Sequence, residues 1–159
     1  MAKEEHAPRT ASEGMVEIPS RGASVMPERL FYDGHCGLCH GAVRFVLARD
    51  RAGTLFRFAP LGGESFLREV PLAERQDLPD SIVVVTREGR RLVRWRAACH
   101  ILLRVGGCWG LLGRVLGAVP AALGDRFYDF VARNRHRFFR KPADTCPVAS
   151  PQLRRRFDP

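Results

Sequence analysis

Two cysteines lie three residues apart in the stretch HCGLCH, at Cys36 and Cys39. At this spacing in a helix the two β-carbons lie about 5–6 Å apart on one face, so a small adjustment lets the sulfurs form a disulfide. A pair that opens and closes this bond carries two electrons by itself, and such chemistry requires no organic cofactor. The spacing therefore predicts dithiol–disulfide exchange.

The two thiols differ in position if a helix begins at Cys36. Unpaired backbone N–H groups and the positive end of the helix dipole stabilise a thiolate at a helix start. Cys39 instead begins an apolar stripe that continues through Val43, Val46 and Leu47, so it should be shielded. We therefore expect Cys36, at the exposed end, to attack a substrate and Cys39 to resolve the mixed disulfide.

Two polar residues ahead of the pair are candidates for tuning it. Asp33 suits two roles equally, a proton relay for the buried thiol and an ordinary turn or cap residue. His35 would favour the Cys36 thiolate if protonated, and is otherwise a solvent-exposed turn histidine. We group Asp33 with the catalytic cysteines and His35 with the residues that tune the site or contact substrate.

The same cysteines fit other kinds of site. Cys36 to His40 matches the haem-attachment pattern C-x-x-C-H, although no export signal is recognisable near the start. For zinc, His35, His40 or Cys146 would have to complete the site, since no second ligand pair follows. A structural zinc-binding domain, or a basic interaction module with incidental cysteines, are therefore the alternative functions.

The apolar pattern around the cysteines predicts alternating strands and helices. Strands are expected at 29–33, 54–60 and 82–85, and a return strand that includes Leu92, Val93 and Trp95 after a Glu88–Gly89 turn; helices are expected at 36–50, 63–70, 97–105, 108–118 and 122–138. The order β-α-β-α-β-β-α predicts an α/β, thioredoxin-like fold with a helical C-terminal extension. In such a fold the loop after the first strand delivers C-x-x-C to a helix N-terminus.

Pro79 immediately precedes the buried strand at 82–85. Thioredoxin-like folds place a cis-proline facing the cysteines at this point, whereas a proline before a strand is also common in general. Pro79 is thus a candidate substrate-contacting residue.

Length and composition predict one globular domain. The chain has 159 residues, of which 45% are hydrophobic and 27% charged. We expect a flexible polar leader at 1–27, the thioredoxin-like core at 28–106, and a helical extension with a basic tail at 107–159, packed on the same domain. Five cysteines, an odd number, favour a reducing compartment, and we expect a cytoplasmic protein.

The net charge of +9 is concentrated near the C-terminus. No nucleic-acid-binding module is recognisable there, so we expect a solvated helix face, a loose tail, and core positions for Phe127, Tyr128 and Phe130. Arg104 and Arg114 interrupt the longest apolar region, which argues against a membrane span. Cys99 and Cys108 are expected to be helix-core thiols.

The stretch FYDGHCGLC, ahead of a helix, resembles the DCC family of thiol-disulfide oxidoreductases, which is named for the residues that here are Asp33, Cys36 and Cys39. The similarity extends through VGGCWGLLGRVLGAVP and DRFYDFVARNRHRFF to the LRRRF that follows Cys146. It implies a thioredoxin-like domain that exchanges disulfides with a protein or a small thiol such as glutathione. It also makes Cys146 a candidate third redox thiol.

Overall fold

The computed structural model describes residues 26–138 and 151–159, except 76–77 and 79–81. Most of the predicted leader, Pro79 and Cys146 lie outside the described residues. The elements are β1 (Glu28–Tyr32), α1 (Gly37–Arg49), β2 (Phe56–Pro60), α2 (Glu64–Glu69), α3 (Leu72–Arg75), β3 (Val83–Val85), β4 (Arg91–Val93), α4 (Arg94–Val105), α5 (Gly107–Gly117), α6 (Ala121–Phe138) and α7 (Pro151–Arg154).

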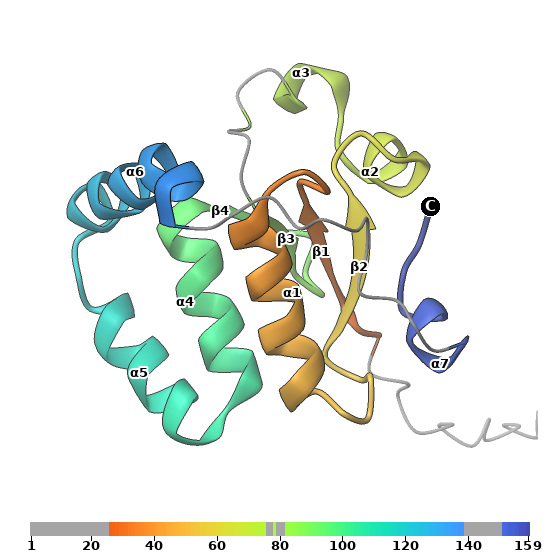
Figure 1. Cartoon of the computed structure of the whole chain (residues 1–159), viewed down its shortest axis with the longest axis horizontal. Coiled ribbons are helices and arrows are strands. Elements are labelled where there is room, and N and C mark those ends of the chain that lie inside the picture. The colour runs from red at the N-terminus through yellow and green to blue at the C-terminus, as the bar shows by residue number, and fades with distance from the viewer. Residues whose placement is uncertain (1–25, 76–77, 79–81, 139–150) are drawn as a thin grey trace, which may run out of the picture.

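A four-stranded mixed sheet in the order β2-β1-β3-β4 forms the centre of the fold (Figure 1). β1 pairs parallel to β2, with Leu30 opposite Phe58, and antiparallel to β3, with Leu30 opposite Val84. β3 and β4 form the antiparallel hairpin. This topology, with α1 connecting the two parallel strands, is thioredoxin-like, as predicted.

Helices cover both faces of the sheet because side chains alternate along each strand. Leu30 and Tyr32 of β1 pack with α1 and α4 in one buried cluster. Phe31, between them in sequence, points to the opposite face, where it meets Phe66 of α2 with ring centroids 5.3 Å apart. Helix α1 is therefore held against a central strand in which only Arg29 is partly exposed.

The return strand is shorter than predicted. Trp95 lies in α4, not in a strand, because Arg94 adopts φ 51° and turns the chain directly from β4 into the helix. The indole N–H of Trp95 then donates to the Leu116 carbonyl oxygen at 3.2 Å, and its ring meets Phe127 edge-on. Trp95 thereby joins α4 to α5 and α6.

Residues 151–159, part of the tail that was expected to be loose, pack along the outer edge of β2 (Figure 1). The Phe58 N–H donates to the Arg156 carbonyl oxygen, and the Asp158 N–H donates to the Phe58 carbonyl oxygen, both at 2.8 Å. Phe157 stacks on Phe58 with ring centroids 5.2 Å apart. Backbone pairing and an aromatic anchor therefore fix this part of the tail.

An ion pair with Asp50 also holds the segment at 151–159 in place. The Arg156 guanidinium lies 2.5 Å from a carboxylate oxygen of Asp50, whose side chain is only 1% exposed. Asp50 also accepts backbone N–H bonds from Thr54, Leu55 and Phe56. Arg156 therefore stabilises the connection between α1 and β2, although Arg156 and Asp50 are about a hundred positions apart in the sequence.

Glycines hold α5 close to α4. A β-carbon on Gly113 would lie 2.9 Å from the Leu103 backbone nitrogen and 3.0 Å from the Cys99 carbonyl oxygen. We expect Gly113→Ala to lower the free energy of unfolding by about 1–3 kcal/mol, because backbone atoms cannot yield as a flexible side chain would. Denaturant unfolding measures this difference.

Gly117 provides the matched control for that measurement, since nothing lies within 4 Å of a β-carbon there. Gly117→Ala, in the same helix, should be neutral or stabilising by up to about 1 kcal/mol. Equal effects at the two positions would contradict the close contact between α5 and α4.

The outer surface of the helical extension differs from the prediction. Phe127 and Phe130 are more than half exposed and do not contribute to the core, and Cys108 is exposed, whereas Cys99 is buried as expected. Within the described part of the chain, no single helix is long and apolar enough to cross a membrane; α5 and the 121–134 part of α6, bent by 115°, meet the length and composition criteria only as a pair.

Candidate active site

A tight turn after β1 delivers the chain to α1. The Asp33 carboxylate accepts a hydrogen bond from the His35 backbone N–H at 2.8 Å, and the Asp33 carbonyl oxygen accepts one from the Cys36 N–H at 3.2 Å. An aspartate that binds a backbone N–H two residues ahead stabilises such a turn. Asp33 therefore has the structural role that was one of its two predicted roles.

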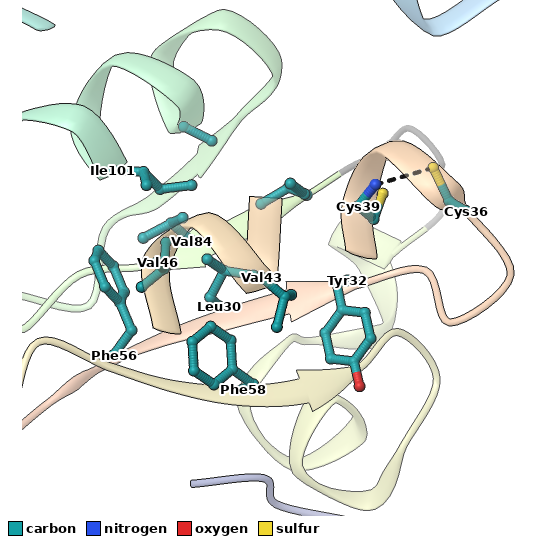
Figure 2. Close-up of a cluster of buried hydrophobic side chains, with 12 residues drawn as sticks. Leu30, Tyr32, Cys36, Cys39, Val43, Val46, Phe56, Phe58, Val84 and Ile101 are labelled. Carbon is teal, nitrogen blue, oxygen red and sulfur yellow. Dashed lines mark hydrogen bonds between the residues drawn. The ribbon is translucent and has the colours of Figure 1, made fainter. Parts of the chain in front are cut away.

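Cys36 is the N-cap residue of α1, with extended backbone angles of φ −97° and ψ 112°. Its sulfur accepts a hydrogen bond from the Cys39 backbone N–H at 3.3 Å, and Figure 2 shows this bond across the first turn. A sulfur that accepts an N–H bond at a helix start is stabilised as a thiolate. Both cysteines are thiols in this structure.

The expected exposure of Cys36 is wrong. Cys36 and Cys39 are each only 2% exposed, and both belong to the buried cluster that contains Tyr32 and Ile82. Cys36 makes the capping bond from within this cluster, packed among its apolar side chains. Access therefore does not distinguish the two thiols, and only their electrostatic surroundings do.

Those surroundings hold the proton on Cys39. A hydrogen bond with Cys36 raises the pKa of the Cys39 thiol, and burial and the charge of Cys36 raise it further. A backbone hydrogen bond with Asp33 acts in the opposite direction, while the Asp33 carboxylate again disfavours the Cys39 thiolate. Asp33 is thus close enough to influence the ionisation of Cys39.

The two histidines beside the cysteines occupy different environments. The His35 side chain is 93% exposed, with Nδ1 3.6 Å from the Asp33 carboxylate. His40 is buried; its Nε2 lies 2.9 Å from the Gly34 carbonyl oxygen, and its ring meets Tyr32 edge-on. Because a carbonyl oxygen only accepts, Nε2 donates in this contact, and His40 stabilises the turn before α1. The position of His40, one residue after the motif, did not indicate this role.

Two predicted site residues, Pro79 and Cys146, lie outside the described residues, so Asp33, His35, Cys36 and Cys39 are the candidates that the structure brings together. Among the residues it describes, no group of three or more His, Cys, Asp or Glu side chains is arranged to hold a metal ion.

Comparison with known proteins agrees with this geometry. The model of the DCC1-like thiol-disulfide oxidoreductase family matches residues 30–141, which include both cysteines and most of the helical extension. The chain belongs to this family. Membership supports a thiol–disulfide role for the DCC1-like domain.

Two curated relatives align over most of the chain. The uncharacterized protein YuxK of Bacillus subtilis is 36% identical over 138 residues, which cover 84% of this chain and 96% of YuxK. A chloroplastic DCC family protein of Arabidopsis thaliana is 29% identical over 119 residues, which cover 75% of this chain and 68% of the relative. No solved structure matches this chain.

The electrostatic difference between the thiols predicts how this DCC1-like protein reacts with iodoacetamide. Cys36 should be alkylated at lower pH than Cys39, because the pKa of Cys39 is raised by the hydrogen bond with Cys36, by burial and by the Cys36 charge. Cys36→Ser removes that charge, so alkylation of Cys39 should begin at lower pH in this variant. Mass spectrometry of each site against pH measures both effects.

Cys99 is the internal control for this titration. Burial alone raises its pKa, so Cys36→Ser should leave its alkylation profile unchanged. Equal rates at Cys36 and Cys39 across the whole pH range would contradict the assigned difference between the thiols.

Proposed function

We propose that the Cys36–Cys39 pair catalyses disulfide exchange with a protein or a small thiol such as glutathione, in the cytoplasm. The observation that carries the proposal is the N-cap position of Cys36, whose sulfur accepts the Cys39 N–H at 3.3 Å. The odd number of cysteines favours a reducing compartment. The pair is itself the redox group, and the direction of exchange depends on the substrate couple.

The proposed reduction of a substrate proceeds in two steps. The Cys36 thiolate attacks a substrate disulfide; a mixed disulfide forms at Cys36 and one substrate thiolate leaves. Cys39 then loses its proton and attacks the Cys36 sulfur, which closes the Cys36–Cys39 disulfide and releases the second substrate thiolate. Two electrons pass from the cysteine pair to the substrate, and oxidation of a substrate dithiol is the same sequence reversed.

Proton transfer from Cys39 is the demanding part of the second step, because the surroundings of Cys39 raise its pKa. We assign Asp33 to accept this proton, since its carboxylate interacts electrostatically with Cys39. His35, with its exposed side chain beside Cys36, is assigned to substrate contact. The roles proposed for Pro79 and Cys146 remain predictions from the sequence.

A redox titration tests the proposal. The protein is equilibrated in glutathione buffers, alkylated and analysed by mass spectrometry. Cys36 and Cys39 should be oxidised together as one two-electron couple, so the ratio of disulfide to dithiol should change tenfold for every change of about 30 mV in potential. Cys39→Ser should abolish that couple. Independent glutathionylation of the two cysteines, with no internal disulfide at any potential, would contradict the proposal.

A further inference from the structure

Apolar side chains point outward on both helices of the extension. Leu111 and Val115 of α5 are 63% and 61% exposed. Leu123, Phe127 and Phe130 of α6 are 59%, 58% and 57% exposed. The spacing of four residues in α5, and of four and three in α6, puts each set on one side of its helix. We call these five residues the outer apolar face.

Glycines form the closest contacts of the same helices with α4. Gly110 and Gly113 of α5 face the α4 backbone, and a β-carbon on Gly124 of α6 would lie 2.2 Å from the Trp95 ring. Turning either helix so that its large apolar residues met α4 would replace these close contacts with side chains that do not fit. The outer apolar face is therefore a fixed feature of the packing, opposite to the usual arrangement in a globular domain.

The charges around the outer apolar face are positive. Arg114, Arg126 and Arg133 are exposed. The two aspartates of α6 are directed toward the start of α4: an Asp125 carboxylate oxygen lies 3.4 Å from the Trp95 backbone nitrogen, and Asp129 lies 3.8 Å from the Arg94 guanidinium. The solvent side of the extension therefore combines large apolar groups with arginines whose charge is not offset by these aspartates.

We propose that α5 and α6 attach the protein peripherally to an anionic lipid bilayer. Helices with an apolar face and flanking arginines lie in the plane of the bilayer interface, with the apolar side chains among the acyl chains and the cations at the headgroups. Leucine and phenylalanine on one side of a helix suit this environment. A second copy of the chain fits less well, since a two-fold contact would bring arginines of the same sign together.

Vesicle sedimentation with the full chain tests the inference. The protein should pellet with vesicles of phosphatidylcholine and phosphatidylglycerol, and about tenfold less with phosphatidylcholine alone, because the arginines require anionic headgroups. Raising the salt concentration should weaken binding through screening. Equal binding to both vesicle types, or none to either, would overturn the proposal.

Two variants separate the apolar from the charged contribution. Leu123→Ser/Phe127→Ser should reduce binding at least about tenfold, as expected for losing two buried apolar side chains. Arg126→Glu/Arg133→Glu should reduce binding to vesicles that contain phosphatidylglycerol and should leave the weak binding to pure phosphatidylcholine vesicles unchanged. The controls are Leu72→Ser, at a 70% exposed leucine of α3, and Arg44→Glu, at an exposed arginine of α1; both should bind as the unaltered protein does.

Sedimentation velocity distinguishes binding to a bilayer from binding to a second copy of the chain. The unaltered protein should remain monomeric without lipid. A dimer that Leu123→Ser/Phe127→Ser dissociates, together with no binding to anionic vesicles, would assign the outer apolar face to self-association and overturn the proposal. The circular dichroism spectrum of each variant should match that of the unaltered protein. If Leu123→Ser/Phe127→Ser does not fold, Arg126→Glu/Arg133→Glu still tests the proposal.

Discussion

Cys39→Ser should accumulate mixed disulfides at Cys36, whereas Cys36→Ser should form none at Cys39. In the proposed mechanism, attack requires the sulfur that caps α1, and release requires the second thiol three residues later. Without Cys39 the reaction stops after its first step, so turnover should fall by roughly a thousandfold or more in either variant. Incubation with oxidised glutathione, followed by non-reducing mass spectrometry, distinguishes a trapped adduct from an absent one.

Cys108→Ser is the control, because Cys108 is exposed on α5, outside the proposed mechanism. Its turnover should match that of the unaltered protein. Adducts that accumulate on Cys39 in Cys36→Ser, and not on Cys36 in Cys39→Ser, would reverse the assignment of the attacking and resolving thiols.

Arg156→Met should lower the free energy of unfolding by about 3–5 kcal/mol, the usual cost of removing one partner of a buried ion pair. Arg156 lies against Asp50, and their side chains are 12% and 1% exposed. Arg156 also donates to the carbonyl oxygens of Asp50 and Phe56. Because Asp50 keeps its backbone N–H donors, we expect a loss near the lower end of this range. Urea unfolding measures it.

The neighbouring Arg155 offers a matched control, since it is exposed. Arg155→Met removes the same charge one residue away and should change the free energy of unfolding by no more than about 0.5 kcal/mol. Similar losses at both positions would mean that net charge, and not the Asp50–Arg156 pair, determines the effect.

Apart from the short helices α3 and α7, which were not predicted, the order of the elements was predictable because it depends on short-range patterns. The Val83–Val85 run, the turn at Gly89 and the stripe from Cys39 to Val46 each indicate one element and require no distant contact. The α4 boundary was not predictable, because it depends on a left-handed backbone at Arg94, and arginine gives no local sign of that conformation.

The position of Cys36 and Cys39 at the start of α1 was predicted from the sequence, but the burial of Cys36 was not. The spacing of Cys36 and Cys39 indicates a helix start, yet the burial of the Cys36 side chain depends on packing with residues distant in the sequence, such as Ile82. A periodic pattern likewise shows that α6 has an apolar side at Phe127 and Phe130, but not whether that side meets the core. The tail contacts at Phe58 and Asp50 join residues about a hundred positions apart, which no local pattern encodes.

The tail that pairs with β2 also bears on how the protein avoids aggregation. β2 is an edge strand, and an open edge offers unpaired backbone groups to another chain. Residues 156–158 occupy those groups at Phe58, while the opposite edge is formed by β4, which has only three residues. Molecules in which the tail has detached would expose β2 to its counterpart in a neighbouring molecule, so intermolecular sheet formation should begin at this edge.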